Sequence, residues 1–333
     1  MSEVRKDVVR DKWVVIATNR AVKPNNLPVP AFGGSTSKMH GFCPFCEGNE
    51  GVTPPELGAV RHPGSEANGP GWTIRAVPNK FSGFSLTEPL AKEVSELYTF
   101  VSGFGAHEVV IETPEHDLDL HEQPVTKISG IFNMLKERHM SLSQDQRLKY
   151  IQIYKNRGLF AGASLSHSHT QIVALPYVPA EFNGATRYAS ETGRCFFCDM
   201  ISQELESRER LVLESDNFVI VCPYASRFTY ETWIIPKKHH DSFGGISSAE
   251  IDEVSELIKK SLQGLVDVLN DPSYNMVINT APINVEPIAG YHWFIEIFPR
   301  LIVQAAVEIA TGYYMNPISP EWAAEVLRTQ FSK

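Results

Sequence analysis

The segment KNRGLFAGASLSHSHTQIVALP, residues 155–176, carries the pattern that decides the fold. It ends in the apolar run QIVALP (171–176), with histidines at positions 167 and 169 just before that run. A similar run, HWFIEIFP (292–299), also begins at a histidine. Short runs of this composition, bounded by glycine or proline, are typical of β-strands.

Around these two strands the same order of features occurs twice. Each copy has a CxxC pair, a β-run that ends in proline and then histidine, another β-run, and finally the histidine-bearing strand. The first copy consists of CPFC (43–46), VVIETPEH (109–116), YIQIY (150–154) and the strand at His167; the second consists of CFFC (195–198), TWIIPKKH (232–239), YNMVIN (274–279) and the strand at His292. We therefore predict duplicated half-domains, with boundaries at residues 1–176 and 177–333.

Strand-like runs outnumber helical ones, and most successive strands have no helix between them. Helices are predicted from Pro124 to about His139, after the Ser247–Ser248 cap, and from Pro320 to Leu327. After the cap, apolar residues recur at helical spacing, namely Ile251, Val254, Ile258, Leu262, Leu265 and Leu269. Because strands without helical crossovers pair antiparallel, we predict an α+β fold with largely antiparallel sheets. Residues 21–42, rich in Pro, Gly and Ser, are expected to form an irregular arm.

The repeat predicts two metal sites of the Cys₂His₂ type. Their ligands would be Cys43, Cys46, His116 and His167 in the first half, and Cys195, Cys198, His239 and His292 in the second. Thiolate and imidazole together favour tetrahedral zinc, and four protein ligands make each zinc structural. A CxxC pair can also be a redox pair. His107 and His240 lie close enough to be ligands in place of their neighbours.

The run HSHTQ (167–171) carries the chemistry. On a strand, residues two apart share a face, so His167, His169 and Gln171 would lie in a row. A neutral imidazole can attack phosphorus, and the small residues Gly162, Ala163 and Ser164 let backbone amides approach an anion. Alternatively, both histidines are metal ligands. The second half has Phe294 where the first has His169, which favours His169 as the nucleophile.

The bulk composition is that of a globular protein. The chain has 333 residues, of which 43% are hydrophobic and 21% charged, and its formal net charge is −9. A net acidic charge disfavours binding to nucleic acid through a broad electrostatic surface. There is no apolar run of about 18 residues, so no membrane span is expected. The charged N-terminal segment lacks a secretory pattern, so we expect a cytoplasmic protein.

With these motifs the chain resembles the galactose-1-phosphate uridylyltransferase family of the histidine-triad superfamily, over nearly its whole length. The similar segments are RKDVVRDKWVVIATNRAVKP (5–24), CPFCEGNEGVTPPE (43–56), RAVPNKFSGF (75–84), HEVVIETPEH (107–116), GASLSHSHTQ (162–171) and HWFIEIFPR (292–300).

The resemblance implies two fused histidine-triad units and a double displacement. A nucleoside diphosphate sugar would give its nucleotidyl group to His169 and release a sugar 1-phosphate, and a second phosphate acceptor would then take the nucleotide. Matching positions imply that Asn156, Ser164 and Gln171 contact phosphates and that Asn79 lies near the nucleoside. Arg20 and Lys23 would approach phosphate from a neighbouring subunit of a homodimer, and residues 307–317 would help to bind the sugar.

Two positions depart from the usual family pattern. Ser168 stands where proline is usual, which is similar to a plant branch with ADP-glucose phosphorylase activity. Phe294 stands where many relatives have histidine, so the second metal site depends on its cysteines. We expect transfer of UMP between UDP-glucose and galactose 1-phosphate. The alternatives are an ADP-glucose phosphorylase or adenylyltransferase, a nucleotide hydrolase, and a zinc-stabilised binding protein without catalysis.

Overall fold

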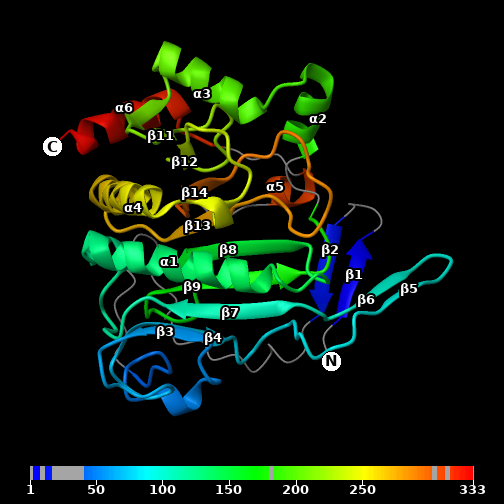
Figure 1. The fold of residues 1–333 in the computed structure, drawn as a ribbon. Coiled ribbons are helices and arrows are strands. Elements are labelled where there is room, and N and C mark those ends of the chain that lie inside the picture. Colours follow the sequence, from blue (N-terminus) through cyan, green and yellow to red (C-terminus); the bar gives the residue numbers. More distant parts are fainter. Residues whose placement is uncertain are drawn as a thin grey trace.

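A ten-stranded antiparallel sheet forms the centre of the molecule (Figure 1). The structure, a computed structural model, describes residues 3–7, 12–16, 41–179, 183–301, 306–311 and 316–332. The strands follow the order β10 (Leu211–Glu214), β11 (Phe218–Val221), β12 (Thr232–Pro236), β14 (Phe294–Pro299), β13 (Tyr274–Asn279), β8 (Tyr150–Arg157), β9 (His169–Leu175), β7 (Ala106–Ile111), β4 (Trp72–Pro78) and β3 (Gly58–Arg61). The predicted α+β class with antiparallel pairing is confirmed.

The strand order is symmetric about the central pair β8–β13. Outward from β8 come β9, β7, β4 and β3, and outward from β13 come β14, β12, β11 and β10. Strands β9 and β14, which follow directly after His167 and His292, therefore each lie second from the centre, beside the strand that leads to the other histidine of the same half. This order brings the CxxC loops, far away in sequence, to the ends of those strands.

Two long helices cover one face of the sheet side by side, α1 (Val125–Leu142) and α4 (Ser248–Leu269) (Figure 1). The apolar stripe of α4 is buried in the main core, as its spacing predicts, with Ile251 and Ile258 fully enclosed. Each such side chain contributes about 1.5–3 kcal/mol through burial. The helix begins in a capping box, in which the Ser247 hydroxyl accepts from Glu250 N and the Glu250 carboxylate accepts from Ser247 N.

Three helices are absent from the sequence prediction: α2 (Asn183–Thr192), α3 (Phe196–Ser207) and α5 (Ala306–Thr311). The last predicted helix, α6, extends from Pro320 to Phe331. In α3, Phe197 and Ile201 pack on the sheet in a second, smaller core cluster. Phe197, Met200, Ile201 and Leu205 recur at helical spacing, so the sequence contained a signal for this helix that our prediction did not use.

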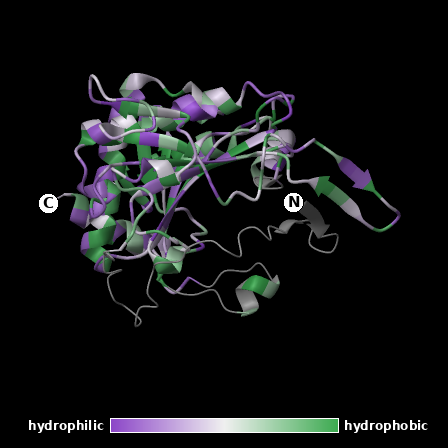
Figure 2. Cartoon of the chain, turned by 90° about the horizontal axis from the view of Figure 1, so that it is seen from below, coloured by the Kyte–Doolittle hydropathy of each residue, from purple (hydrophilic) through white to green (hydrophobic). Residues whose placement is uncertain are grey.

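A four-stranded sheet stands apart from the main one, in the order β2 (Lys12–Ile16), β1 (Glu3–Asp7), β6 (Thr99–Ser102) and β5 (Lys92–Val94). The β5–β6 hairpin projects from the body at the right of Figure 1, and in Figure 2 hydrophilic and hydrophobic stretches alternate along it. The predicted irregular arm lies outside the described residues except for residues 41 and 42. Among the described helices, none has the length and hydrophobicity needed to cross a membrane.

Candidate active site and metal centres

A cavity of about 230 Å³ lies beside the first residues of strand β9. Four predicted site residues line it, namely Asn79, Ser164, His169 and Gln171. The rest of its wall is largely apolar and includes Phe42, Phe45, Val77, Phe81 and Val109. An apolar cleft with a few convergent polar groups is the usual form of a small-molecule site, and its flat aromatic walls suit a nucleoside.

His169 is held in one orientation by its own strand. Its Nδ1 donates to the carbonyl oxygen of His167 at 2.7 Å, which leaves Nε2 with the lone pair. The residue is 7% exposed, and burial lowers its pKa to about 4. The ring is therefore neutral near pH 7, which is the protonation state that a nucleophilic imidazole requires.

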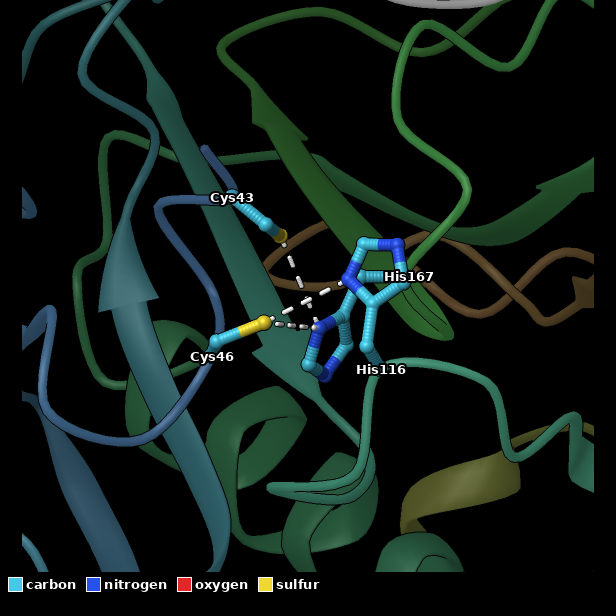
Figure 3. A group of neighbouring side chains, drawn as sticks. All are labelled: Cys43, Cys46, His116 and His167. Atoms are coloured by element: carbon cyan, nitrogen blue, oxygen red, sulfur yellow. Dashed lines mark hydrogen bonds between the residues drawn. The ribbon is translucent and has the colours of Figure 1, made fainter. Parts of the chain in front are cut away.

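The four predicted ligands of the first metal site point toward one another (Figure 3). His167 Nδ1 lies 3.6 Å from Cys43 Sγ and 3.7 Å from Cys46 Sγ, and His116 Nδ1 lies 3.3 Å from Cys46 Sγ. The other nitrogen of His167, Nε2, donates to Thr113 O at 2.7 Å. That bond places the lone pair of His167 on Nδ1, toward the thiols.

These distances fit a tetrahedral zinc ion. Zinc bonds of about 2.3 Å to sulfur and about 2.0 Å to nitrogen place tetrahedral S and N ligand atoms roughly 3.5 Å apart. Burial and the adjacent Cys43 raise the pKa of Cys46 to about 12, so a cation is needed to make it a thiolate. The four protein donors fill the coordination shell, so a zinc ion here would stabilise the fold and not bind substrate.

The second half repeats this geometry. Cys198 Sγ lies 3.5 Å from His239 Nδ1, and His292 Nδ1 lies 3.9 Å from Cys198 Sγ and 4.0 Å from Cys195 Sγ. His292 Nε2 donates to Pro236 O at 2.9 Å, three residues before His239, just as Thr113 lies three residues before His116. All eight predicted ligands therefore fall into two groups that could each hold a metal, and His107 and His240 belong to neither.

Where the first half has the cavity, the second half has an apolar cluster. Phe294, the counterpart of His169, is 2% exposed and packs against Phe197 and Trp233, with ring centroids 5.1 and 4.8 Å away. Helix α3 supplies Phe197 and closes this side of the sheet. The fold is therefore duplicated, whereas the candidate nucleophile is present in the first half.

A buried histidine orients two of the predicted substrate-binding residues. His107 Nε2 lies 3.0 Å from Gln171 Oε1 and 3.1 Å from Asn79 Nδ2. Tyr154 also donates to Gln171 Oε1 at 3.2 Å, and Asn79 Oδ1 accepts from Phe81 N. We did not predict this role of His107 from the sequence. A signal was present, because His107 and Val109 are two residues apart on one strand and so face the same side of the sheet, and Val109 lines the cavity.

The loop before β9 contains a glycine with left-handed backbone geometry. Gly162 has a φ of +80°, in the left-handed region, so its conformation requires glycine although the space beside it is open. Ser164 follows and lines the cavity. Asn156 is not among the cavity residues, and its Oδ1 accepts from Asn275 Nδ2 at 2.7 Å.

Three predicted elements lie wholly or partly outside the described residues. Arg20 and Lys23 belong to the segment that the structure does not describe. Of the predicted sugar-binding stretch 307–317, only residues 307–311 and 316–317 are described.

Comparisons with known families agree with this arrangement. The family of the galactose-1-phosphate uridyl transferase N-terminal domain matches residues 67–179, and that of the C-terminal domain matches residues 181–330. The two matches together cover well over half of the chain.

Individual relatives extend over nearly the whole chain. An ADP-glucose phosphorylase of Arabidopsis thaliana is 37% identical over 98% of this chain and 92% of its own length. A galactose-1-phosphate uridylyltransferase of Thermotoga maritima is 31% identical over 98% of both chains.

Solved structures show the same fold. A crystal structure of an ADP-glucose phosphorylase from Arabidopsis thaliana with bound ADP-glucose is similar with a TM-score of 0.75 and 34% identity, over 98% of this chain and 99% of that one. A uridylyltransferase structure is similar with a TM-score of 0.80 and 25% identity, over 99% and 98%. The chain therefore belongs to the galactose-1-phosphate uridylyltransferase family and is a nucleotidyltransferase.

Proposed function

We propose that the protein transfers a nucleotidyl group from a nucleoside diphosphate sugar through a covalent intermediate on His169. The observation that carries this proposal is the neutral imidazole at the cavity wall, with Nδ1 bonded to His167 O and the lone pair on Nε2. In the first step Nε2 bonds to the α-phosphorus, and the bond from that phosphorus to the bridging oxygen breaks. The sugar 1-phosphate leaves with the bridging oxygen. In the second step an acceptor phosphate oxygen attacks the same phosphorus and releases the histidine.

We infer that ADP-glucose is the preferred donor and inorganic phosphate the acceptor, so the products are glucose 1-phosphate and ADP. The Arabidopsis relative named ADP-glucose phosphorylase supports this, with 37% identity over 98% of this chain. Ser168 within the HSHTQ run supports it too, because serine at this position resembles that plant branch. The second candidate is UMP transfer between UDP-glucose and galactose 1-phosphate, which the 31% identity to the Thermotoga enzyme favours.

The roles proposed for the other site residues come from the family resemblance and, for the residues that line the cavity, also from their positions. The Ser164 hydroxyl and the Gln171 amide would donate to phosphate oxygens, and Asn79 would border the nucleoside. Asn156 would contact phosphate through its amide nitrogen, because its oxygen already accepts from Asn275. Arg20 and Lys23 would contribute cations from the neighbouring subunit. Zinc would occupy both Cys₂His₂ groups and stabilise the strand that carries His169.

We also propose that the chain divides into repeated halves, 1–176 and 177–333, and acts as a cytoplasmic homodimer. The family matches meet between residues 179 and 181, which supports the division. Five free cysteines suit a reducing compartment.

The β5–β6 hairpin supports the dimer. It exposes Val94, Leu97 and Tyr98, each at 70% or more, and such side chains favour burial against a second copy. Sedimentation equilibrium would show a mass of one chain if the dimer is wrong.

The decisive experiment uses ADP-glucose and UDP-glucose, each labelled at the α-phosphate, without an acceptor. We expect acid-labile label on the protein, faster from ADP-glucose, and its release as ADP when phosphate is added. The variant His169→Ala should keep its zinc and fail to take label. Absence of label from both donors would contradict the mechanism. Label that passes only to water would indicate a hydrolase.

A further inference from the structure

A fully buried ion pair lies directly behind the strand that carries His169. Lys155 of β8 is 1% exposed, and Glu112, just after β7, is 0% exposed. Lys155 Nζ donates to Glu112 Oε2 at 2.8 Å. Both charges come from β-runs that otherwise bury apolar side chains, so their presence needs a physical reason.

The ion pair makes hydrogen bonds to three successive residues of the HSHTQ run, Ser168, His169 and Thr170. Lys155 Nζ also donates to Ser168 Oγ at 2.9 Å and to the carbonyl oxygen of His169 at 3.3 Å. Glu112 accepts from Ser168 Oγ through Oε2 at 2.5 Å and from Thr170 Oγ1 through Oε1 at 2.6 Å. All three ammonium donors and both carboxylate oxygens are therefore used on residues 168–170 or on each other.

Stability alone does not account for this arrangement. Removing two charges from water costs several kcal/mol per ion, and apolar residues of similar volume often serve a core equally well or better. What the pair adds is geometry, because ionic hydrogen bonds are short and directional. Ser168 and Thr170 lie on the opposite side of the strand from His169, since successive side chains alternate. The ion pair therefore bonds to one face of the strand, while the side chain of His169 lies on the other face and lines the cavity.

We propose that Lys155 and Glu112 form a positioning clamp that fixes His169 in its attacking orientation. The clamp acts through Ser168, Thr170 and the backbone of His169, and it touches neither substrate nor the reacting atoms. By holding residues 168–170 it fixes the distance between His169 Nδ1 and His167 O, which is 2.7 Å. That bond sets both the tautomer and the direction of Nε2. The clamp's effect on catalysis rests on the proposed function, in which His169 is the nucleophile.

The test replaces both charges together, so that no buried ion is left alone. The variant Lys155→Met/Glu112→Leu should keep its zinc content, with a somewhat lower thermal midpoint because the buried hydroxyls of Ser168 and Thr170 lose their partners. We expect kcat of the overall reaction, measured as ADP formed from ADP-glucose and phosphate, to fall about 10- to 100-fold, because a small displacement of a reacting group has an effect of this size. KM for the sugar nucleotide should stay within about threefold, because the cavity residues are untouched. If this variant fails to fold, Lys155→Met/Glu112→Gln keeps a partner for both hydroxyls and serves in its place.

A matched control removes another buried ion pair of the same half. Arg138 donates to both oxygens of Glu108 at 2.8 Å, and the pair lies between α1 and β7 without a bond to residues 168–170. Arg138→Met/Glu108→Leu should change kcat much less than the clamp variant. An equal loss in both would overturn the proposal, because it would indicate a general effect of removing a buried pair.

A crystal structure of the clamp variant separates this inference from the proposed function. We expect the contact between His169 Nδ1 and His167 O to lengthen or the ring to occupy a second position. An unchanged ring, or wild-type kcat, would overturn the clamp. If the wild-type protein takes no label from either donor, the proposed mechanism fails, while the ring position still decides whether the clamp exists.

Discussion

At the scale of single residues, the two histidines of the HSHTQ run differ in which ring nitrogen they leave free. His167 donates from Nε2 to Thr113 O and turns Nδ1 toward the thiols, whereas His169 donates from Nδ1 and leaves Nε2 for the cavity. The backbone carbonyl to which each ring donates therefore determines which nitrogen stays free, and so distinguishes the metal ligand from the candidate nucleophile. Strand periodicity places both rings on one face, but it does not set their tautomers.

The contacts of His107 lead to a prediction about kcat/KM at this scale. His107→Phe removes the nitrogen beside Gln171 Oε1 and Asn79 Nδ2, so each amide keeps only its other contact, with Tyr154 or with Phe81 N. Because neutral hydrogen bonds contribute about 0.5–1.5 kcal/mol each, we expect kcat/KM to fall roughly tenfold. Steady-state kinetics with the preferred sugar nucleotide would measure this, with His62→Phe on the surface as the control. Equal kinetics in both variants would show that His107 does not organise the site.

His139 makes the stability of the protein depend on pH. It is 2% exposed, neither of its ring nitrogens has a hydrogen-bond partner, and burial lowers its pKa from 6.5 to about 4. The unfolded chain therefore binds a proton first as the pH falls, and stability is lost between pH 6.5 and pH 4. The shift corresponds to about 3 kcal/mol.

Chemical denaturation at several pH values checks this prediction. His139→Leu removes the titrating group, so its free energy of unfolding should fall less steeply than that of the wild type below pH 6.5. The two proteins should differ most near pH 4. Parallel curves over the whole range would rule out His139 as a contributor.

At the scale of elements, β9 and β14 show how one strand pattern serves two purposes. Both begin beside a metal group and run second from the sheet centre. In β9 the face that carries His169 and Gln171 lines the cavity, whereas α3 covers β14 and fills the equivalent space with aromatic rings. Sequence comparison of the halves predicted the substitution by Phe294. It did not predict that α3 covers β14, because the comparison aligned strands and gives no information on which face a helix packs against.

The cap of α4 offers a test of element stability. Ser247→Ala removes the side-chain bond to Glu250 N, and the loss of such an N-cap typically costs about 1 kcal/mol. Ser248→Ala, one residue later, is the matched control because Ser248 lies within the helix. Thermal melting monitored by circular dichroism should show a lower midpoint for Ser247→Ala than for Ser248→Ala. Identical midpoints would mean that the cap contributes nothing measurable.

At the scale of the whole molecule, the two metal groups join segments that are distant in sequence. In the first, the CxxC loop meets the start of β9, and His167 stands 124 positions after Cys43. In the second, His292 stands 97 positions after Cys195. Metal binding energy of this kind is folding energy, because the unfolded chain does not contain the site.

We therefore expect two zinc ions per chain and a clear fall in melting temperature on chelation. Elemental analysis should show that Cys46→Ser and Cys198→Ser each lose one of the two ions. Cys222→Ala is the control, because Cys222 is buried outside both groups and should leave both ions in place. Chelation should also slow the labelling of His169, since His167 anchors the same strand. A full zinc complement in either ligand variant would contradict the assignment.

The sequence by itself determined the strand-rich class, the two Cys₂His₂ sets and the row His167, His169 and Gln171. These are properties of periodicity and of a repeated order, and both are visible in one dimension. It did not predict the roles of His107, Lys155 and Glu112, which act on residues far along the chain. Only the tertiary structure decided that Nδ1 of His167 turns toward the thiols, because Thr113 O is brought close from a distant segment. For His169 the acceptor is local, since His167 O lies two residues earlier, and the folded conformation of the strand brings the two together. The tertiary structure likewise decided that one half keeps a cavity while the other is filled by α3.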